Sequence, residues 1–238
     1  MQVFQDKEFH RGTFADRDSA AVYEGFDFNR CCFQSYFLSL TSNPALRSTI
    51  RNVRLHECSQ RGCTLYAAIV EDVLVDGLNT NGQLVRAHGA VFNRVVLRGK
   101  IDRLMLNDTL LPSSLAAEAA RQREIALFQQ ANMEFYRRVD WALDISGGEF
   151  VELDIGGIPG RLIRRDPETQ VLVKHDRVLQ EDWRNLDFNA PITSFVLDEM
   201  LKRNTPDKVL IAPKRHPKFR DYLSDLQLLR RAGVAEPE

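Results

Sequence analysis

The side chains of this chain that could act together in catalysis are evenly spaced along the sequence. His56, Asp76 and Arg98 follow one another at separations of 20 and 22 residues. If the chain coils with a repeat of that length, the three side chains form one outward column with a base, an acid and a cation that could bind an anion. A solvated charge ladder on a protein surface has the same pattern, and we favour this simpler interpretation.

A second group of chemically versatile side chains lies near the C-terminus. Lys214, Arg215 and His216 follow an expected strand and precede an expected helix. A basic loop before a helix start can bind phosphate or a nucleic-acid backbone. Because aromatic side chains are not interleaved with these cations, we favour solvated loop charge here too.

The cysteines suggest packing more than metal chemistry. They are Cys31, Cys32, Cys58 and Cys63. No Cys-x-x-Cys pair and no close histidine completes a zinc set, so we expect reduced, buried thiols, no metal and no cofactor. The sequence also lacks a Walker-type phosphate loop, a Gly-x-Ser-x-Gly nucleophile and a His-Glu-x-x-His site.

Charge and hydropathy favour neither nucleic acid nor a membrane. The 238 residues carry a formal net charge of -1, with 13 basic and 12 acidic residues in positions 1–110 and 19 and 21 in the rest. No secretory signal opens the sequence, and no apolar stretch approaches the roughly 18 residues that span a bilayer. We expect a cytoplasmic protein, and the excess of 25 arginines over 7 lysines favours a bacterial one.

An apolar rhythm of five residues organises positions 25–106. Cut in fives, residues 52–76 are NVRLH, ECSQR, GCTLY, AAIVE and DVLVD, with a small or β-branched residue second and usually a larger apolar residue fourth. Four units make a rung of twenty residues, and each rung of such a solenoid buries its interior against its neighbours. Val53, Val73 and Val95 should therefore share one interior column.

Period-two alternation along a strand then predicts which side chains point outward. The expected outward columns are Arg30, Asn52, Asp72 and Arg94; Gln34, His56, Asp76 and Arg98; and, between them, Cys32, Arg54, Leu74 and Val96. Asp72 should meet Arg94, and Asp76 should meet Arg98. The apolar part of the middle column invites a covering element.

Several units resemble those of the pentapeptide-repeat proteins. The best matches are Arg30-Cys31-Cys32-Phe33-Gln34, Gly62-Cys63-Thr64-Leu65-Tyr66, Gly89-Ala90-Val91-Phe92-Asn93 and Arg94-Val95-Val96-Leu97-Arg98. The resemblance implies a right-handed quadrilateral β-helix that binds partners, and a parallel β-helix of another cross-section is the alternative. Some members of this family mimic acidic duplex DNA, but the near-neutral charge of this region argues against such mimicry.

We expect three parts in a mixed β and α/β fold. Residues 1–110 form a short right-handed parallel β-helix (solenoid), whose first 24 residues are an aperiodic cap anchored by Phe4, Phe9, Phe14 and Tyr23. Residues 111–145 form a long connecting helix of about 30 residues that starts near Ser113 and Ser114. Its apolar stripe is Ile125, Phe128, Asn132, Phe135, Val139 and Ala142. Residues 146–238 form a small α/β module with strands at 150–155, 161–165, 171–174 and 208–212, and helices at 194–203 and 217–232.

These features favour a non-enzymatic protein that binds a protein partner, such as an inhibitor, an immunity factor or an assembly adaptor. The expected contact residues are Arg54, His56, Leu74, Asp76, Val96 and Arg98. The alternative is an enzyme or binding protein for phosphate-containing ligands or nucleic acid that uses Lys214, Arg215 and His216. Membrane association is not expected, and the oligomeric state, including a homo-oligomer, is left open.

Overall fold

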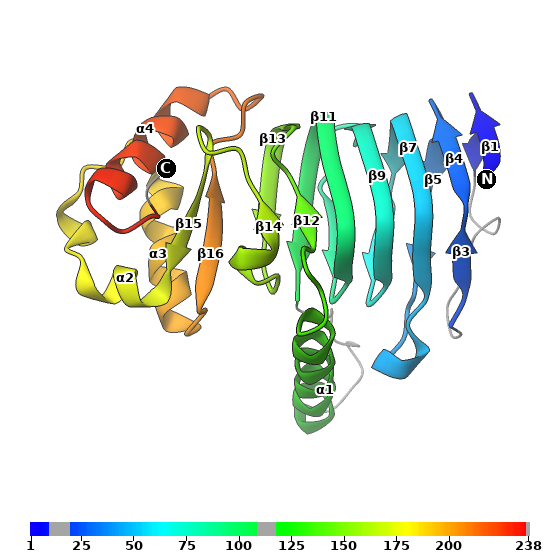
Figure 1. Cartoon of the computed structure of the whole chain (residues 1–238), viewed down its shortest axis with the longest axis horizontal. Coiled ribbons are helices and arrows are strands. Elements are labelled where there is room, and N and C mark those ends of the chain that lie inside the picture. Colours follow the sequence, from blue (N-terminus) through cyan, green and yellow to red (C-terminus); the bar gives the residue numbers. More distant parts are fainter. Residues whose placement is uncertain (10–19, 109–117, 237–238) are drawn as a thin grey trace.

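A computed structural model describes residues 1–9, 20–108 and 118–236. The fold combines a large, curled parallel sheet with a few helices and a small two-stranded sheet at the C-terminal end (Figure 1). The strands are β1 (Gln2–Gln5), β2 (Glu8–Phe9), β3 (Val22–Glu24), β4 (Phe26–Asn29), β5 (Cys32–Gln34), β6 (Phe37–Leu38), β7 (Thr49–Arg61), β8 (Thr64–Tyr66), β9 (Ile69–Asn79), β10 (Val85–His88), β11 (Val91–Asn107), β12 (Leu143–Asp144), β13 (Gly148–Ile155), β14 (Ile163–Arg164), β15 (Gln170–Lys174) and β16 (Asp207–Ile211). The helices are α1 (Glu118–Tyr136), α2 (His175–Gln180), α3 (Pro191–Lys202) and α4 (Phe219–Arg231), with 3₁₀ turns η1 (Pro44–Leu46), η2 (Gly160–Leu162) and η3 (Trp183–Asn185).

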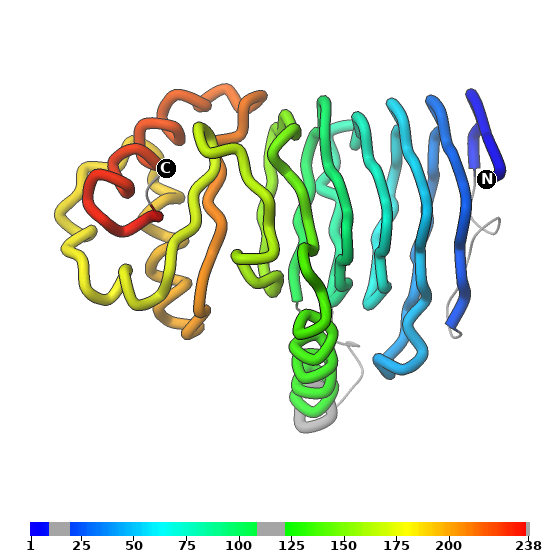
Figure 2. The backbone as a smooth tube through the Cα atoms, in the orientation of Figure 1, coloured from blue at the N-terminus to red at the C-terminus, as the bar shows by residue number. Residues whose placement is uncertain are grey.

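Within the described residues the large sheet has 14 strands, and its main path runs β1-β4-β7-β9-β11-β10-β8-β6. The path turns back at β11, because the first half of β11 pairs with β9 and its second half pairs with β10. Successive stretches of backbone therefore lie side by side from the N-terminus toward the middle of the chain (Figure 2). This arrangement is compatible with a β-helix-like fold.

The three longest strands carry the predicted valine column. Val53 on β7 is in register with Val73 on β9, and Val73 is in register with Val95 on β11. The three side chains are 4, 6 and 3 % exposed. The prediction that they stack in the interior is confirmed.

The five-residue rhythm coincides with a repeated backbone conformation. Positive φ angles recur at every fifth residue from 52 to 82, at Asn52, Glu57, Gly62, Ala67, Asp72, Gly77 and Gly82. This left-handed conformation is costly for most L-residues and easiest for glycine, asparagine and aspartate. Each unit thus begins at a sharp bend of the backbone, and the succession of bends curls the sheet.

The register predicted for the first stretch is wrong by one unit. We expected residues 28–31 to align with 50–53, an offset of 22, but Phe28 pairs with Leu55 and Cys32 pairs with Ser59, an offset of 27. The difference is 27 − 22 = 5 residues, and a five-residue pattern looks the same after a shift of five. Arg30, Cys32 and Gln34 therefore do not continue the columns of Asn52, Arg54 and His56.

Two loops interrupt the five-residue repeat in the described residues, one before β7 and one after β9. The segment before β7 contains η1, with Asn43 accepting a hydrogen bond from the Ala45 N–H at 3.0 Å. The second interruption is a turn at Asn81 and Gly82, which both have positive φ. These excursions account for the offsets of more than 20 residues.

The N-terminal residues add strands where we expected an aperiodic cap. β1 pairs with β4, β2 with β5, and β3 with β7, all in parallel. Phe4 stacks on Phe28 with ring centroids 5.2 Å apart, and Phe9 stacks on Phe33 at 5.5 Å. Phe4 and Phe9, two of the four predicted anchors, therefore pack on neighbouring strands. Tyr23 lies on β3 in register with Ile50, and Phe14 lies outside the described residues.

The cysteines are all free, as predicted. Cys31 and Cys58 are fully buried, and Cys32 and Cys63 are partly buried. The Sγ atoms of Cys31, Cys58 and Cys63 donate to the carbonyl oxygens of Phe4, Phe28 and Phe33, at 3.5, 3.4 and 3.5 Å. These cysteine thiols thus form hydrogen bonds to the backbone of neighbouring strands.

Cys58 should resist alkylation in the folded protein. Burial raises its pKa to about 11, so only about 0.1 % of it is thiolate at pH 8. Cys32 is partly exposed and serves as the internal comparison. A time course of iodoacetamide labelling followed by mass spectrometry should show Cys32 modified at least about 100-fold faster. Equal rates at the two sites would contradict the burial of Cys58.

Helix α1 ends at Tyr136, before Val139 and Ala142 of the predicted apolar stripe. Its described span is Glu118–Tyr136, 19 residues, while Ser113 and Ser114 lie outside the described residues. Phe128 is fully buried beside Ala67, and the guanidinium carbon of Arg47 lies 4.9 Å from the centroid of the Phe128 ring. Arg47 also donates to Asn132 and to the carbonyl oxygen of Gly89.

These contacts place α1 at the beginnings of the long strands. Arg47, Ala67 and Gly89 each precede one of β7, β9 and β11 by two residues. The helix projects from this end of the sheet (Figure 1). The described contacts of α1 lie at these strand ends, so α1 is not the element that covers Leu74 and Val96. Burial beside α1 lowers the pKa of Arg47 to about 10.

The C-terminal part is smaller than predicted. The strands expected at 150–155 and 161–165 were assigned to the α/β module, but β13 pairs with β11 and β14 pairs with β12. The remaining strands, β15 and β16, form an antiparallel pair that packs with α2, α3 and α4 around Trp183, Leu197 and Leu229. The helices near 194–203 and 217–232 are confirmed as α3 and α4, within a few residues at their ends.

Candidate functional site

Six side chains predicted to bind a partner lie together on the outer side of the long strands. Arg54, Leu74 and Val96 are in register on β7, β9 and β11, and His56, Asp76 and Arg98 form the next outward column. We call these six residues the ladder face. Leu74 and Val96 are partly exposed at its centre, while Arg54 and Arg98 are exposed. The register of these six residues was predicted correctly, because the offsets of 20 and 22 residues hold between these strands.

The charges of the ladder face pair along their columns. Arg98 Nη2 and Nε donate to Asp76 Oδ2 at 2.8 and 3.0 Å. Beside this pair, Arg94 Nε donates to Asp72 Oδ1 at 2.6 Å, and this hydrogen bond lowers the pKa of the Asp72 carboxyl. Both predicted pairs are confirmed. Their side chains are 32 to 51 % exposed, so each pair contributes only about 0–1 kcal/mol to stability.

The ladder face does not form a catalytic dyad. His56 Nδ1 lies 3.6 Å from Asp76 Oδ2, beyond hydrogen-bond length, and that oxygen already accepts both bonds from Arg98. A general base needs its partner within about 2.6–3.2 Å. Among the described residues, no cluster of three His, Cys, Asp or Glu side chains could hold a metal ion.

The column continues onto the strands that follow β11. Val96 is in register with Asp144 on β12, and Asp144 is in register with Arg164 on β14. The guanidinium carbon of Arg164 lies 4.0 Å from the centroid of the Trp141 ring. A partly exposed aromatic and an exposed arginine thus extend the surface beyond the six predicted residues. This extension could not be predicted from the repeat, because residues 111–145 were assigned to a connecting helix and residues 146–238 to a separate module.

The three residues predicted to bind an anion lie in the connection between β16 and α4. Lys214 Nζ is 2.8 Å from Asp166 Oδ2, and Arg215 Nη1 is 3.0 Å from Asp102 Oδ1. His216 Nδ1 accepts a hydrogen bond from the Lys218 N–H at 3.0 Å. The two cations are therefore directed to carboxylates of this chain, which lie on two different segments.

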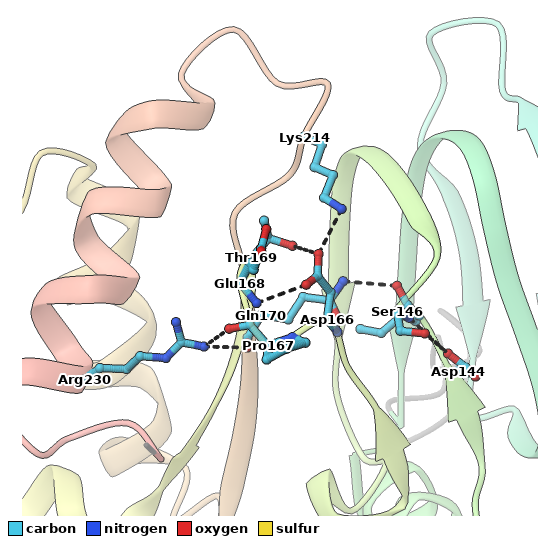
Figure 3. A network of polar contacts seen from close by, with 10 residues as sticks. Asp144, Ser146, Asp166, Pro167, Glu168, Thr169, Gln170, Lys214 and Arg230 are labelled. Carbon is cyan, nitrogen blue, oxygen red and sulfur yellow. Dashed lines mark hydrogen bonds and ion pairs between the residues drawn. The ribbon is translucent and has the colours of Figure 1, made fainter. Parts of the chain in front are cut away.

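Asp166 is the centre of a polar network that joins the large sheet to the C-terminal module (Figure 3). Its carboxylate accepts hydrogen bonds from the Glu168 N–H at 3.0 Å and from Thr169 Oγ1 at 2.8 Å, and it pairs with Lys214. Gln170 Oε1 accepts from the Asp166 N–H, and Gln170 Nε2 donates to the Ile145 carbonyl oxygen. These bonds fix the turn between β14 and β15.

One more residue extends this network from α4. Arg230 Nη2 donates to the carbonyl oxygens of Pro167 and Gln170, so the last helix is bonded to the same turn. On the sheet side, Ser146 Oγ donates to Asp144 Oδ1 at 2.6 Å (Figure 3). The network is a structural junction, since its donors and acceptors satisfy one another.

Asp166 should make stability depend on pH. Burial acts to raise the pKa of its carboxyl, but the hydrogen bonds from Lys214, Thr169 and Glu168 outweigh this effect, and the pKa is lowered below 3.8. A lowered pKa stabilises the folded state above the unfolded value, and this contribution disappears as the pH falls through the folded value. Lys214→Met should reduce stability at pH 7 by about 0.5–1 kcal/mol and by less at pH 2.5. Urea denaturation at both pH values measures this, and an equal loss at both would contradict the ion pair.

Two buried charged residues escaped the sequence analysis. Asp225 is 0 % exposed on α4, and Arg47 is 6 % exposed before β7. Asp225 is three residues after Tyr222 and four before Leu229, which places it on the apolar side of the helix. That position is the signal that could have revealed it.

Comparisons with protein-family models, with curated proteins and with solved structures found no match for this chain. Among the described helices, none is long and apolar enough to cross a membrane.

Proposed function

We propose that this chain is a non-enzymatic binding protein, such as an inhibitor, an immunity factor or an assembly adaptor, that recognises a protein partner through the ladder face. The observation that carries the proposal is the register of β7, β9 and β11. It sets Leu74 and Val96 side by side between columns of charged residues. Protein interfaces combine an apolar centre with a polar, solvated rim, and this surface has that composition.

The polar groups of the ladder face are spread along the strands. Arg98 pairs with Asp76 within this face, and Arg94 pairs with Asp72 beside it, so these four charges are already oriented on the surface. Fixed charges of both signs suit the recognition of a complementary surface. A substrate site would instead bring unpaired groups together around a hollow.

We also propose that residues 25–108 form a right-handed solenoid like that of the pentapeptide-repeat proteins. Left-handed backbone conformations at every fifth residue support one bend per unit. The parallel register of β7, β9 and β11 supports stacking of successive rungs. A rigid stack of rungs would hold the ladder face flat, so that little conformational entropy would be lost on binding. We propose a cytoplasmic location as well, because four free thiols are compatible with a reducing compartment.

The experiment compares a face variant with a matched control on the other side of the sheet. The test variant is Leu74→Arg with Val96→Glu. The control is Thr64→Arg with Met105→Glu, since Thr64 and Met105 flank Arg86 in another outward column. Proteins retained by the immobilised wild type from an extract of the source organism are identified by mass spectrometry, and binding is then measured with the purified partner.

The proposal predicts a stoichiometric complex that the face variant weakens at least about tenfold and the control leaves unchanged. Circular dichroism verifies that both variants are folded. Equal binding by the face variant, or catalytic turnover by the purified protein alone, would contradict the proposal.

The alternative is phosphate or nucleic-acid binding through Lys214, Arg215 and His216. The ion pairs of Lys214 with Asp166 and of Arg215 with Asp102 make it the weaker proposal, because a ligand phosphate would compete with both carboxylates. Salt-dependent binding of a nucleotide or duplex DNA, lost when the three residues are changed to alanine, would favour it.

A further inference from the structure

The N-terminal part of the curled sheet surrounds an apolar cavity of about 230 Å³. The described lining residues are Tyr23, Phe26, Phe28, Phe33, Tyr36, Leu38, Ile50, Val53, Leu55, Gln60, Cys63, Leu78 and Val85. They come from β3 to β10 and the connections between them, so both halves of the curled sheet contribute. The cavity lies inside the fold, on the opposite side of β7 from the ladder face.

Aromatic rings form one wall of this cavity. Phe28 and Phe33 meet edge to face with ring centroids 5.1 Å apart, and Phe33 meets Tyr36 in the same way at 6.2 Å. Phe26 lies 5.8 Å from Phe28. Rings in such contacts present edges and faces that suit another flat ring. Aliphatic side chains, such as Val53 and Leu55 on β7, form the facing wall.

The polar groups near the cavity are turned away from it. Gln60 is 4 % exposed, its Nε2 donates to the Thr80 carbonyl oxygen at 3.3 Å, and its Oε1 accepts from the Cys63 N–H at 2.9 Å. Cys63 Sγ donates to the Phe33 carbonyl oxygen. Among the described lining residues, only apolar atoms face the void. The cavity is partly open to solvent, and this apolar lining offers water no hydrogen bonds.

An apolar pocket of this size leaves the side chains that line it without close-packed neighbours on one side. Folded proteins leave few spaces larger than a water molecule, because each empty volume loses dispersion contacts and destabilises the fold. An apolar cavity of about 150 Å³ is large enough for benzene. The larger cavity here has room for a one- or two-ring compound, and it is too small for a nucleotide or a long acyl chain.

We propose that this cavity binds a small, flat, apolar molecule of one or two rings. Tyr23, Phe26 and Phe33 are partly exposed, so the aromatic wall also reaches the surface. A bound ring would replace the missing dispersion contacts and stabilise the folded state. This site is independent of the ladder face, and either proposal can fail without the other.

The test uses the full chain with benzene and indole as probes, followed by thermal unfolding and by methyl NMR. At a free concentration ten times the dissociation constant, either probe should raise the Tm by about 3–6 °C. The methyl signals of Val53 and Leu55 should shift, whereas those of Leu197 in the C-terminal module should not. Absence of both effects with both probes would overturn the proposal.

Filling variants locate the binding site. Val53→Phe and, independently, Val85→Phe place a ring in the cavity, so each should abolish the response to benzene and indole. Val95 belongs to the same valine column as Val53 but does not line the cavity. Val95→Phe should therefore lower the Tm by overpacking and retain the response. An undiminished response in a folded Val53→Phe or Val85→Phe variant would show that the probes bind elsewhere and would refute the proposal.

Discussion

Replacing Val73 with asparagine should lower the free energy of unfolding by about 3–5 kcal/mol, whereas Leu74→Asn should lower it by less than about 1 kcal/mol. Val73 is 6 % exposed at the centre of the valine column, so the substitution removes buried apolar area and leaves an amide without hydrogen-bond partners. Leu74 is the next residue on β9, and its side chain points to the partly exposed outer side. Asparagine is chosen because an aspartate at position 74 would also be repelled by Asp72 and Asp76.

Urea denaturation monitored by circular dichroism measures both variants under the same conditions. A difference of several kcal/mol between adjacent positions is expected only if strand alternation divides interior from surface. Similar losses for the two variants would mean that β9 is not oriented as described.

Asp225→Ala should lower the free energy of unfolding by about 3–5 kcal/mol. The Asp225 carboxylate is fully buried, and it accepts from the Asn189 and Ala190 N–H groups at 2.8 and 3.0 Å and from Thr193 Oγ1 at 2.7 Å. It thereby satisfies donors at the start of α3, where a negative charge is also favoured by the helix dipole. Alanine would leave the Ala190 N–H and the Thr193 hydroxyl, which belong to buried residues, without this partner.

Asp225→Asn is the matched control for size. Its amide oxygen can keep one set of hydrogen bonds, but its NH₂ group faces donors on the other side, so we expect an intermediate loss of about 1–3 kcal/mol. Urea denaturation again provides the measurement, with the fluorescence of the buried Trp183 reporting on the C-terminal module. A loss below 1 kcal/mol for Asp225→Ala would show that water or another group reaches these donors.

The repeat could be predicted between residues 49 and 98 because its cause is local. Each five-residue unit carries its own bend and its own small and large apolar positions, so Val53, Val73 and Val95 could be aligned from spacing alone. The same reasoning placed Arg94 beside Asp72. The ladder face follows directly from that alignment.

The pairing of more distant elements could not be predicted in this way. A five-residue pattern is unchanged by a shift of one unit, so spacing could not tell whether Phe28 aligns with Ile50 or with Leu55. A strand such as β13 has the same apolar alternation whether it joins β11 or a separate sheet. Long-range packing determines which strands pair, and it leaves no periodic signal in the sequence.

The candidate sites show the same difference between local spacing and long-range contacts. Surface residues of the repeat, such as Asp76 and Arg98, could be placed from their spacing. The partners of Lys214 and Arg215 could not, because Asp166 and Asp102 are far away in sequence and are brought near by the junction of sheet and module. Asp225 was missed because a charged residue in a helical pattern is usually assigned to the solvent-exposed side of the helix.

The most direct test of the account is the contact between the valines of the interior column, measured by methyl NOEs in a selectively labelled sample. Adjacent strands lie about 4.8 Å apart, so the methyl groups of Val73 should give cross-peaks to both Val53 and Val95. A soluble paramagnetic agent should broaden the methyl signals of Leu74 and Val96 and spare those of the column. Absence of both valine contacts, or equal broadening of Val73 and Leu74, would contradict the register on which the ladder face depends.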